Sequence, residues 1–431
     1  MGNTATTLHP LTTPPPGTAE TGRIAWLHRR AGFSLAPADL QAATARGLAA
    51  ELDRITEPDG HGIPATPTPW ATEDFAAIDK QQQAVPRIVT AWLDHQLASP
   101  RPLEQRIVFM LHGLLVSSVE KVRNVGLMAR QIRLYQDMAG ASYPELLAAV
   151  TTDGAMLWYL DGRDSTGDEP NENYARELME LFALGEGNYS EADVKAAARA
   201  LTGWTLRGPR GRGVVRFEPR RHDPAGQSLL GASGVNDVAS VVAAVTAQPA
   251  HADFVARRVA SEFLGSATAE DLGAIAAAYR AGGNRLVPAI RVALELGLAG
   301  HGSSIVTAPM HWLLMARRVT GAAPKLGRRT FAAGGQIPLR PPNVAGWPGG
   351  RAWLATSSMV ARIQMAAIIA KATSPDLPLM QACAGGSVAE IATLLGLPEP
   401  FGPSTAAALG SAMPADRRLA TALVSPEFLV S

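Results

Sequence analysis

The stretch of sequence that decides the fold is PNENYARELMELF, residues 170–182. Proline suits the first position of a helix, and at about 100° per residue the polar side chains that follow it gather on one side. The apolar side chains take the opposite side, which predicts an amphipathic helix packed against other helices. The polar stripe of this helix consists of Glu172, Asn173, Arg176, Glu177 and Glu180.

This polar stripe has two interpretations. It contains no lysine, serine or threonine, and its groups suit bidentate hydrogen bonds, ion pairs or hard metal ions. Taken alone, it favours an ordinary solvated face joined by i,i+4 pairs from Glu172 to Arg176 and from Arg176 to Glu180. Taken with the other polar clusters described below, it favours a face that points inward and meets imidazole and guanidinium groups.

Composition limits the class of protein. The chain has 431 residues, of which 47% are hydrophobic, enough for a large core in one domain or in two closely joined ones. Lys plus Arg number 39 and Asp plus Glu 38, and this balance argues against a nucleic-acid partner. The single cysteine, Cys383, excludes an internal disulfide framework and a cysteine-based zinc site.

Targeting signals are missing from the sequence. No run reaches the ~18 apolar residues that a membrane helix needs, so we expect no membrane partner. Residues 1–20 have neither the basic start nor the apolar segment of a secretory signal. We therefore predict a cytoplasmic protein with a disordered tail over residues 1–21.

Helical patterns dominate the remainder, residues 22–431, and strand signals are scarce. We predict an all-α fold, a large multi-helix bundle with long irregular Pro/Gly-rich loops, built as one domain or as two sub-bundles that meet near residues 205–235. Ser34 and Ser190 are expected to cap helices, and residues 205–231 to form a loop or short hairpin. Helices are expected over residues 21–30, 75–97, 103–118, 123–138, 143–152, 155–160 and 190–201.

Four separated motifs resemble one family. They read IAWLHRRAGFSLAPADL (24–40), PNENYARELMELFALGEGNYSEADVKAAARALTGW (170–204), HDPAGQSLLG (222–231) and GGQIPLRPPNVAGWPGGRAWL (334–354). The chain resembles the bacterial family catalogued as domain of unknown function 1800. This resemblance implies a largely helical protein, often exported and often encoded near a partner of another uncharacterised family, and it implies no agreed reaction.

The chain also departs from the pattern of that family. Relatives typically carry Trp-His-Asn-His-Phe where residues 111–115 read Leu-His-Gly-Leu-Leu, so one of two histidines is missing. The lysine usual after the His-Asp pair is Gln227, and the export signal is absent. These departures suggest a specialised cytoplasmic branch.

Polar residues in apolar or turn contexts form the candidate site. Singly, each has a plain explanation, since His112 resembles a satisfied core histidine and residues 222–224 resemble an Asx turn. Jointly they predict an active site, because a buried imidazole costs several kcal/mol unless it is partnered. The predicted catalytic groups are Glu172, Glu177, Glu180, His222 and Asp223. The predicted substrate-binding groups are Arg29, Arg30, Asn171, Asn173, Arg176 and Arg199.

A divalent metal is the cofactor that these residues would suit. His112, Glu180 and His222 could hold Mg, Mn or Fe, although the helix lacks the Glu-x-x-His pair of di-iron bundles. Two lower-ranked alternatives are isoprenoid chemistry with Mg and a diphosphate, and haem bound through His112. The acidic loop that would hold Mg contains Asp161, Asp164, Asp168 and Glu169.

The favoured prediction is an enzyme of unassigned reaction acting on a small molecule. A carboxylate or phosphate group of the substrate would bind Arg176 and its neighbours, while His222 or a glutamate moves protons. The alternative is a non-catalytic scaffold or a protein that binds a partner, in which the polar cluster and the tryptophans Trp204, Trp347 and Trp353 only fix helices and loops.

Overall fold

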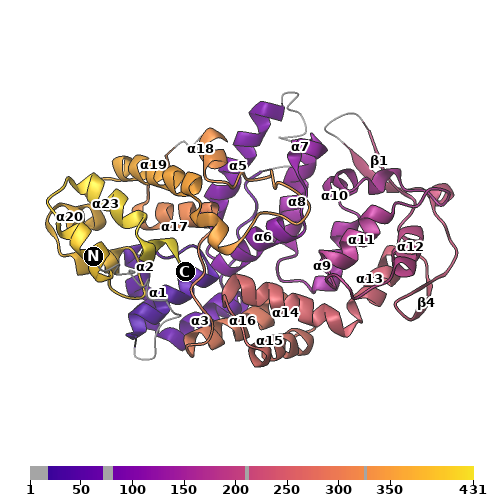
Figure 1. Cartoon of the computed structure of the whole chain (residues 1–431), viewed down its shortest axis with the longest axis horizontal. Coiled ribbons are helices and arrows are strands. Elements are labelled where there is room, and N and C mark those ends of the chain that lie inside the picture. The colour runs from indigo at the N-terminus through magenta and orange to yellow at the C-terminus, as the bar shows by residue number, and fades with distance from the viewer. Residues whose placement is uncertain (1–17, 71–80, 209–212, 325–327) are drawn as a thin grey trace, which may run out of the picture.

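The structure is a computed structural model that describes residues 18–70, 81–208, 213–324 and 328–431 (Figure 1). The described chain is mostly helical with two short hairpins, so the predicted all-α class is confirmed. Of the predicted tail, residues 1–17 lie outside the described part, and Glu20 already begins the first helix. In the first part of the chain the helices are α1 (Glu20–Ala31), α2 (Pro37–Arg46), α3 (Leu48–Thr56), α5 (Gln81–Ala98), α6 (Pro102–Leu114), α7 (Val119–Val122), α8 (Val125–Asp137), α9 (Tyr143–Thr151) and α10 (Gly154–Tyr159).

The later helices complete the body. They are α11 (Glu172–Glu180), α12 (Glu191–Ala200), α13 (Val238–Thr246), α14 (Pro249–Phe263), α15 (Ala269–Ala281), α16 (Leu286–Leu298), α17 (Pro309–Thr320), α18 (Arg328–Ala333), α19 (Thr356–Ala372), α20 (Pro378–Gly385), α21 (Val388–Leu394), α22 (Pro403–Gly410), α23 (Ala415–Leu423) and α24 (Pro426–Leu429). Short 3-10 helices are η1 (Pro58–His61), η2 (Gly162–Asp164), η3 (Pro219–Arg221) and η4 (Gly350–Leu354).

Two antiparallel hairpins occupy the segment predicted to be a loop or short hairpin. Strand β1 (Trp204–Arg207) pairs with β2 (Val214–Phe217), with Trp204 opposite Phe217. Strand β3 (Gln227–Leu229) pairs with β4 (Ala232–Val235). These hairpins lie at the right-hand end in Figure 1, next to α10–α13.

Local signals explain several helix ends. Ser190 forms the predicted capping box with Asp193 at the start of α12. The predicted cap at Ser34 is wrong, because α2 starts after Ala36 and Ser34 has a φ of 66° in the turn that precedes it. The helix predicted over residues 103–118 ends earlier, at Leu114, and the next four residues form an extended link to α7.

One hydrophobic core connects most of the molecule. It extends from Trp26 in α1 to Leu429 in α24 and includes the buried faces of α6, α14, α16 and α17. Division into two sub-bundles stays a prediction. The described residues contain no helix that is both long enough and apolar enough to span a bilayer.

Helix α16 packs closely on α1 at Gly297. A Cβ atom at this position would overlap the ring of Trp26, which is buried. We expect Gly297→Ala to lower the free energy of unfolding by about 1–3 kcal/mol through overpacking. Gly273→Ala is the matched control, because no atom lies within 4 Å of its added Cβ. In a helix, that control should stabilise by up to about 1 kcal/mol, and equal urea midpoints for the two variants would contradict this packing.

Candidate functional site

The polar stripe of α11 lies at the protein surface. The buried face of α11 consists of Tyr174, Ala175, Leu178 and Met179, and it packs into the core. On the opposite side, Asn173 is exposed and the other residues of the stripe are half-buried. Asn171 is the N-cap of the helix: its Oδ1 accepts from Asn173 N at 2.9 Å and its Nδ2 donates to Leu160 O at 2.8 Å.

The stripe uses its charges on the neighbouring helix. Arg176 forms a bidentate ion pair with Glu191 of α12, at 2.7 and 2.8 Å. Glu180 accepts a hydrogen bond of 2.5 Å from the Tyr189 hydroxyl. The first pair joins α11 to α12, and the second joins α11 to the turn before α12. The predicted i,i+4 pairs are replaced by these contacts. Burial and then the charge of Glu180 raise the pKa of Glu177, which is half-buried.

The loop that carries His222 and Asp223 also makes local contacts. His222 Nδ1 lies 3.1 Å from Thr202 O, and Asp223 Oδ2 lies 2.7 Å from Arg199 Nη1. Asp223 Oδ1 accepts from Ala225 N at 3.0 Å, which is the Asx turn that the plainer interpretation predicts. The structure therefore brings three predicted site residues together in a turn close to the surface.

The predicted metal ligands do not meet. His112 contacts Trp92 and Trp347, whereas Glu180 contacts Tyr189 and His222 lies beside Phe217. In the part of the chain that the structure describes, no three His, Cys, Asp or Glu side chains are placed to share a metal ion. The acidic loop 161–170 also lacks such a group of metal ligands among the described residues. Its Asp161 pairs with Lys121, and its Asp164 pairs with Arg163.

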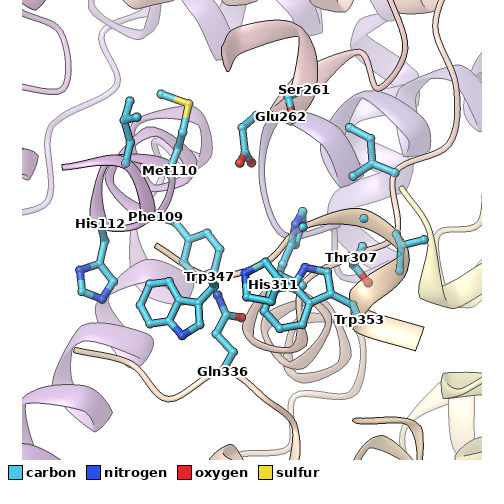
Figure 2. A pocket seen from close by; sticks show the side chains of 18 of the residues that line it. Phe109, Met110, His112, Ser261, Glu262, Thr307, His311, Gln336, Trp347 and Trp353 are labelled. Atoms are coloured by element: carbon cyan, nitrogen blue, oxygen red, sulfur yellow. The ribbon is translucent and has the colours of Figure 1, made fainter. Parts of the chain in front are cut away.

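A cavity of about 320 Å³ lies elsewhere, where α6, α14 and α17 meet the loop of residues 334–349 (Figure 2). Its volume is in the range of small-molecule sites, which begins near 300 Å³. Of the predicted site elements, only the helix of His112 lines it. The polar lining consists of Arg106, His112, Arg258, Ser261, Glu262, Thr307, His311 and Gln336, and the aromatic lining of Phe109, Trp347 and Trp353.

His112 holds the loop that closes this cavity. Its Nε2 accepts a hydrogen bond of 3.1 Å from Leu339 N, so this nitrogen is not free to bind a metal or haem iron. The imidazole lies between Trp92 and Trp347, with ring centroids 5.0 and 5.2 Å away. Burial lowers the pKa of His112 to about 3, so the ring is neutral at physiological pH.

The loop lies tightly against α6. Gly346 has a φ of 86°, and any Cβ there would collide with the carbonyl of Gly113. Gln336 Oε1 accepts from Met310 N at 3.0 Å and so caps the start of α17. These contacts place Trp347 and Trp353 in the cavity wall (Figure 2).

His311, in the first turn of α17, is the second histidine that lines this cavity (Figure 2). Backbone carbonyls of Gly32 and Arg29 face one ring nitrogen, whereas Nε2 is buried and has no hydrogen-bond partner among the described residues. Burial, and then the charges of Arg106 and Arg29, hold the pKa of His311 well below its usual value. The ring is therefore neutral, with an unused nitrogen in the wall.

Arginines surround His311. Arg106 donates to Glu262 Oε2 at 2.7 Å, and its Nε and Nη1 have no partner in the described chain. Arg29 and Arg30, both predicted to bind substrate, lie behind the cavity wall and are 1% exposed. Arg29 donates to Val430 O at 2.6 Å and Arg30 to Ser303 O at 2.7 Å.

Comparison with known proteins gives one match. The model of the family described as a protein of unknown function, DUF1800, matches residues 26–430. The chain belongs to the DUF1800 family. No curated protein and no solved structure matches it.

Three consecutive residues at the end of α6, His112, Gly113 and Leu114, line the cavity. Sequence reasoning missed His311 and Arg106. The available signal was a histidine between apolar residues just after Pro309, the same pattern that singled out His112.

Proposed function

We propose that this cavity is the active site of an enzyme that moves a proton on a small molecule, with His311 as the acid–base group. The supporting observation is that His311 lines the cavity and that its Nε2 atom is buried without a partner among the described residues. A buried polar atom without a partner costs about 1–3 kcal/mol, so such an atom points to a ligand that completes it.

The surroundings of His311 suit proton transfer. Carbonyl groups of Gly32 and Arg29 orient the ring by accepting from Nδ1, which leaves the lone pair on Nε2. Burial, and then the charges of Arg106 and Arg29, keep the imidazole neutral, which is the form that accepts a proton. An anionic substrate would offset these two cations and so raise the pKa of His311 from its lowered value, which favours proton uptake. The sequence predicts acid–base chemistry at His222 or a glutamate, and we propose His311 for that role instead.

Proton NMR in D2O tests this proposal. The wild-type protein is incubated with a defined mixture of small carboxylic acids, phosphate esters and carbonyl compounds, and each resonance is followed for exchange or turnover. We expect His311→Asn to lower the rate of exchange or turnover of the affected compound by about 10²–10⁴-fold. The far- and near-UV circular dichroism spectra should stay unchanged. His61→Asn is the matched control, because His61 is exposed in η1. Equal rates in His311→Asn and wild type would refute the role of His311.

The alternative function, a scaffold or partner-binding protein, has one observation in its favour. Val360, Ile363 and Ile368 are each more than 40% exposed along one side of α19, and Leu354 of η4 precedes them. Exposed apolar side chains on one face are typical of protein contacts. A wild-type protein that leaves every compound of the mixture unchanged would favour this alternative.

A further inference from the structure

The cavity carries an excess of positive charge. Arg106 and Arg258 line it, and Glu262 is the one carboxylate among its lining residues. Directly behind its wall, Arg362 donates to Thr307 O at 2.7 Å and Arg30 to Ser303 O at 2.7 Å. These guanidinium groups hydrogen-bond to backbone carbonyls, which supply no counter-charge.

Many guanidinium nitrogens remain without partners. In Arg29, Arg30, Arg106 and Arg362, both Nε and Nη1 are buried with no hydrogen-bond partner among the residues that the structure describes. Burial lowers the pKa of Arg29 and Arg30 to about 9 and that of Arg362 to about 10, so all three are still charged at neutral pH. A buried cation without a counter-charge is costly, and an anion in the cavity would offset part of that cost.

Sequence composition around the cavity points the same way. Residues 296–375 contain no aspartate or glutamate at all. This segment supplies the wall from Ile305 to Trp353, including His311 and Gln336. It contains the basic residues Arg317, Arg318, Lys325, Arg328, Arg329, Arg340, Arg351, Arg362 and Lys371.

Glu262 does not cancel this excess. Its carboxylate is bound to Nη2 of Arg106 at 2.7 Å, and its side chain is 40% exposed, so solvent screens it. Arg106 is 4% exposed and keeps Nε and Nη1 for another acceptor. Guanidinium N–H groups form strong, charge-assisted hydrogen bonds with carboxylate and phosphate oxygens.

The aromatic walls indicate what carries the anion. Trp347 and Trp353 come from the loop side and Phe109 from α6, on the same cavity as Arg106 (Figure 2). Aromatic side chains favour an apolar or planar body in the ligand. We propose that the cavity binds a small organic oxyanion, whose carboxylate or phosphate contacts Arg106 and whose body lies against Trp347 and Trp353. This inference deepens the proposed function by naming its substrate class, and it rests on the same cavity.

Calorimetric titration of the full chain with two probes tests the inference. Benzoate represents the carboxylates and phenyl phosphate the phosphates, with benzyl alcohol as the uncharged counterpart, all at one ionic strength set with chloride. We expect saturable binding of at least one anion, about tenfold or more tighter than benzyl alcohol, because a charge-assisted hydrogen bond is stronger than a neutral one. Tighter binding of benzoate identifies a carboxylate site, and tighter binding of phenyl phosphate identifies a phosphate site.

Variants locate the bound anion. Arg106→Gln should weaken binding by about tenfold or more. Because this change could unfold the protein, Arg258→Gln is the second variant, with Arg257→Gln as its matched control on the same helix. Both arginines are exposed on α14, but only Arg258 lines the cavity. We expect Arg258→Gln to weaken binding by about threefold or more and Arg257→Gln to leave it within about twofold, since screened surface charges contribute little.

The outcomes separate this inference from the proposed function. His311→Asn should still bind the anion, because the arginines hold it, even though proton transfer is lost. Equal affinities for the anions and benzyl alcohol, or equal losses in Arg257→Gln and Arg258→Gln, would overturn the oxyanion site and leave the role of His311 standing. Intact anion binding with equal turnover in His311→Asn would overturn only the proton-transfer role.

Discussion

Glu51→Gln is expected to lower the free energy of unfolding by about 3–5 kcal/mol, because it breaks a buried ion-pair cluster. The carboxylate of Glu51 is 0% exposed in α3. It accepts from His28 Nε2 of α1 at 2.8 Å, from Arg46 Nε of α2 at 2.7 Å and from Arg54 Nη1 at 3.4 Å. One carboxylate therefore joins the first three helices, and glutamine would leave cations without a counter-charge.

The same cluster predicts a loss of stability in acid. Burial alone would raise the pKa of Glu51, but hydrogen bonds from His28 and Arg46 outweigh it and hold the pKa at about 2, against 4.5 for a free glutamate. A lowered carboxyl pKa contributes stability that is complete above pH 4.5 and is lost as the pH falls towards 2. Burial also lowers the pKa of His28, so His28 takes up a proton at a lower pH in the folded state than in the unfolded chain. Both groups thus destabilise the fold in acid.

Urea unfolding at several pH values measures this effect. The wild type should lose stability as the pH falls below about 6.5, and more steeply below about 4.5. Glu51→Gln should lack the steeper loss of stability below about pH 4.5. Glu57→Gln is the matched control, since Glu57 pairs with Arg291 at 3.1 Å but its side chain is 68% exposed. That control should change stability by about 1 kcal/mol or less. Similar losses of unfolding free energy in both variants would contradict a special contribution of the buried Glu51 cluster to stability.

Much of the fold was predictable from local pattern. The period of apolar residues indicates most of the helices, and the serine-to-aspartate spacing at Ser190 and Asp193 indicates a capping box that the structure contains. These signals are local, because a helix and its cap are set within a few residues. Ser34 is not the cap because α2 begins later, after Ala36, and Ser34 lies in the preceding turn with a φ of 66° in place of the extended backbone usual at an N-cap.

The candidate site was less predictable, because it depends on contacts between distant segments. Arg176 was expected to meet a substrate, but Glu191 from the following helix occupies both of its terminal nitrogens. His311 and Arg106 come from helices about two hundred residues apart, and nothing in the sequence indicates that these two side chains lie close together. Arg29 and Arg30 were singled out, and neither lines the cavity, although the charge of Arg29 acts on His311.

His112→Ala is the second variant for which we expect a large loss of stability. The change removes the acceptor for Leu339 N, which is buried, and it removes the ring between Trp92 and Trp347. An unpaired buried N–H costs about 1–3 kcal/mol and the cavity adds to it, so we expect a loss of about 2–4 kcal/mol. The loop of residues 334–349 should open locally at the same time, since His112 connects it to α6.

Hydrogen exchange and urea unfolding together check this role of His112. Amide exchange in residues 334–349 should become faster in His112→Ala, while α15 and α16, which supply no residue to the cavity lining, keep their protection relative to global stability. His61→Ala, at an exposed position, should change neither measurement. Because burial lowers the pKa of His112 to about 3, the wild type loses stability as the pH falls from about 6.5, and the variant should lose less. Unchanged loop exchange in His112→Ala would contradict a positioning role and return His112 to the candidates for direct ligand contact.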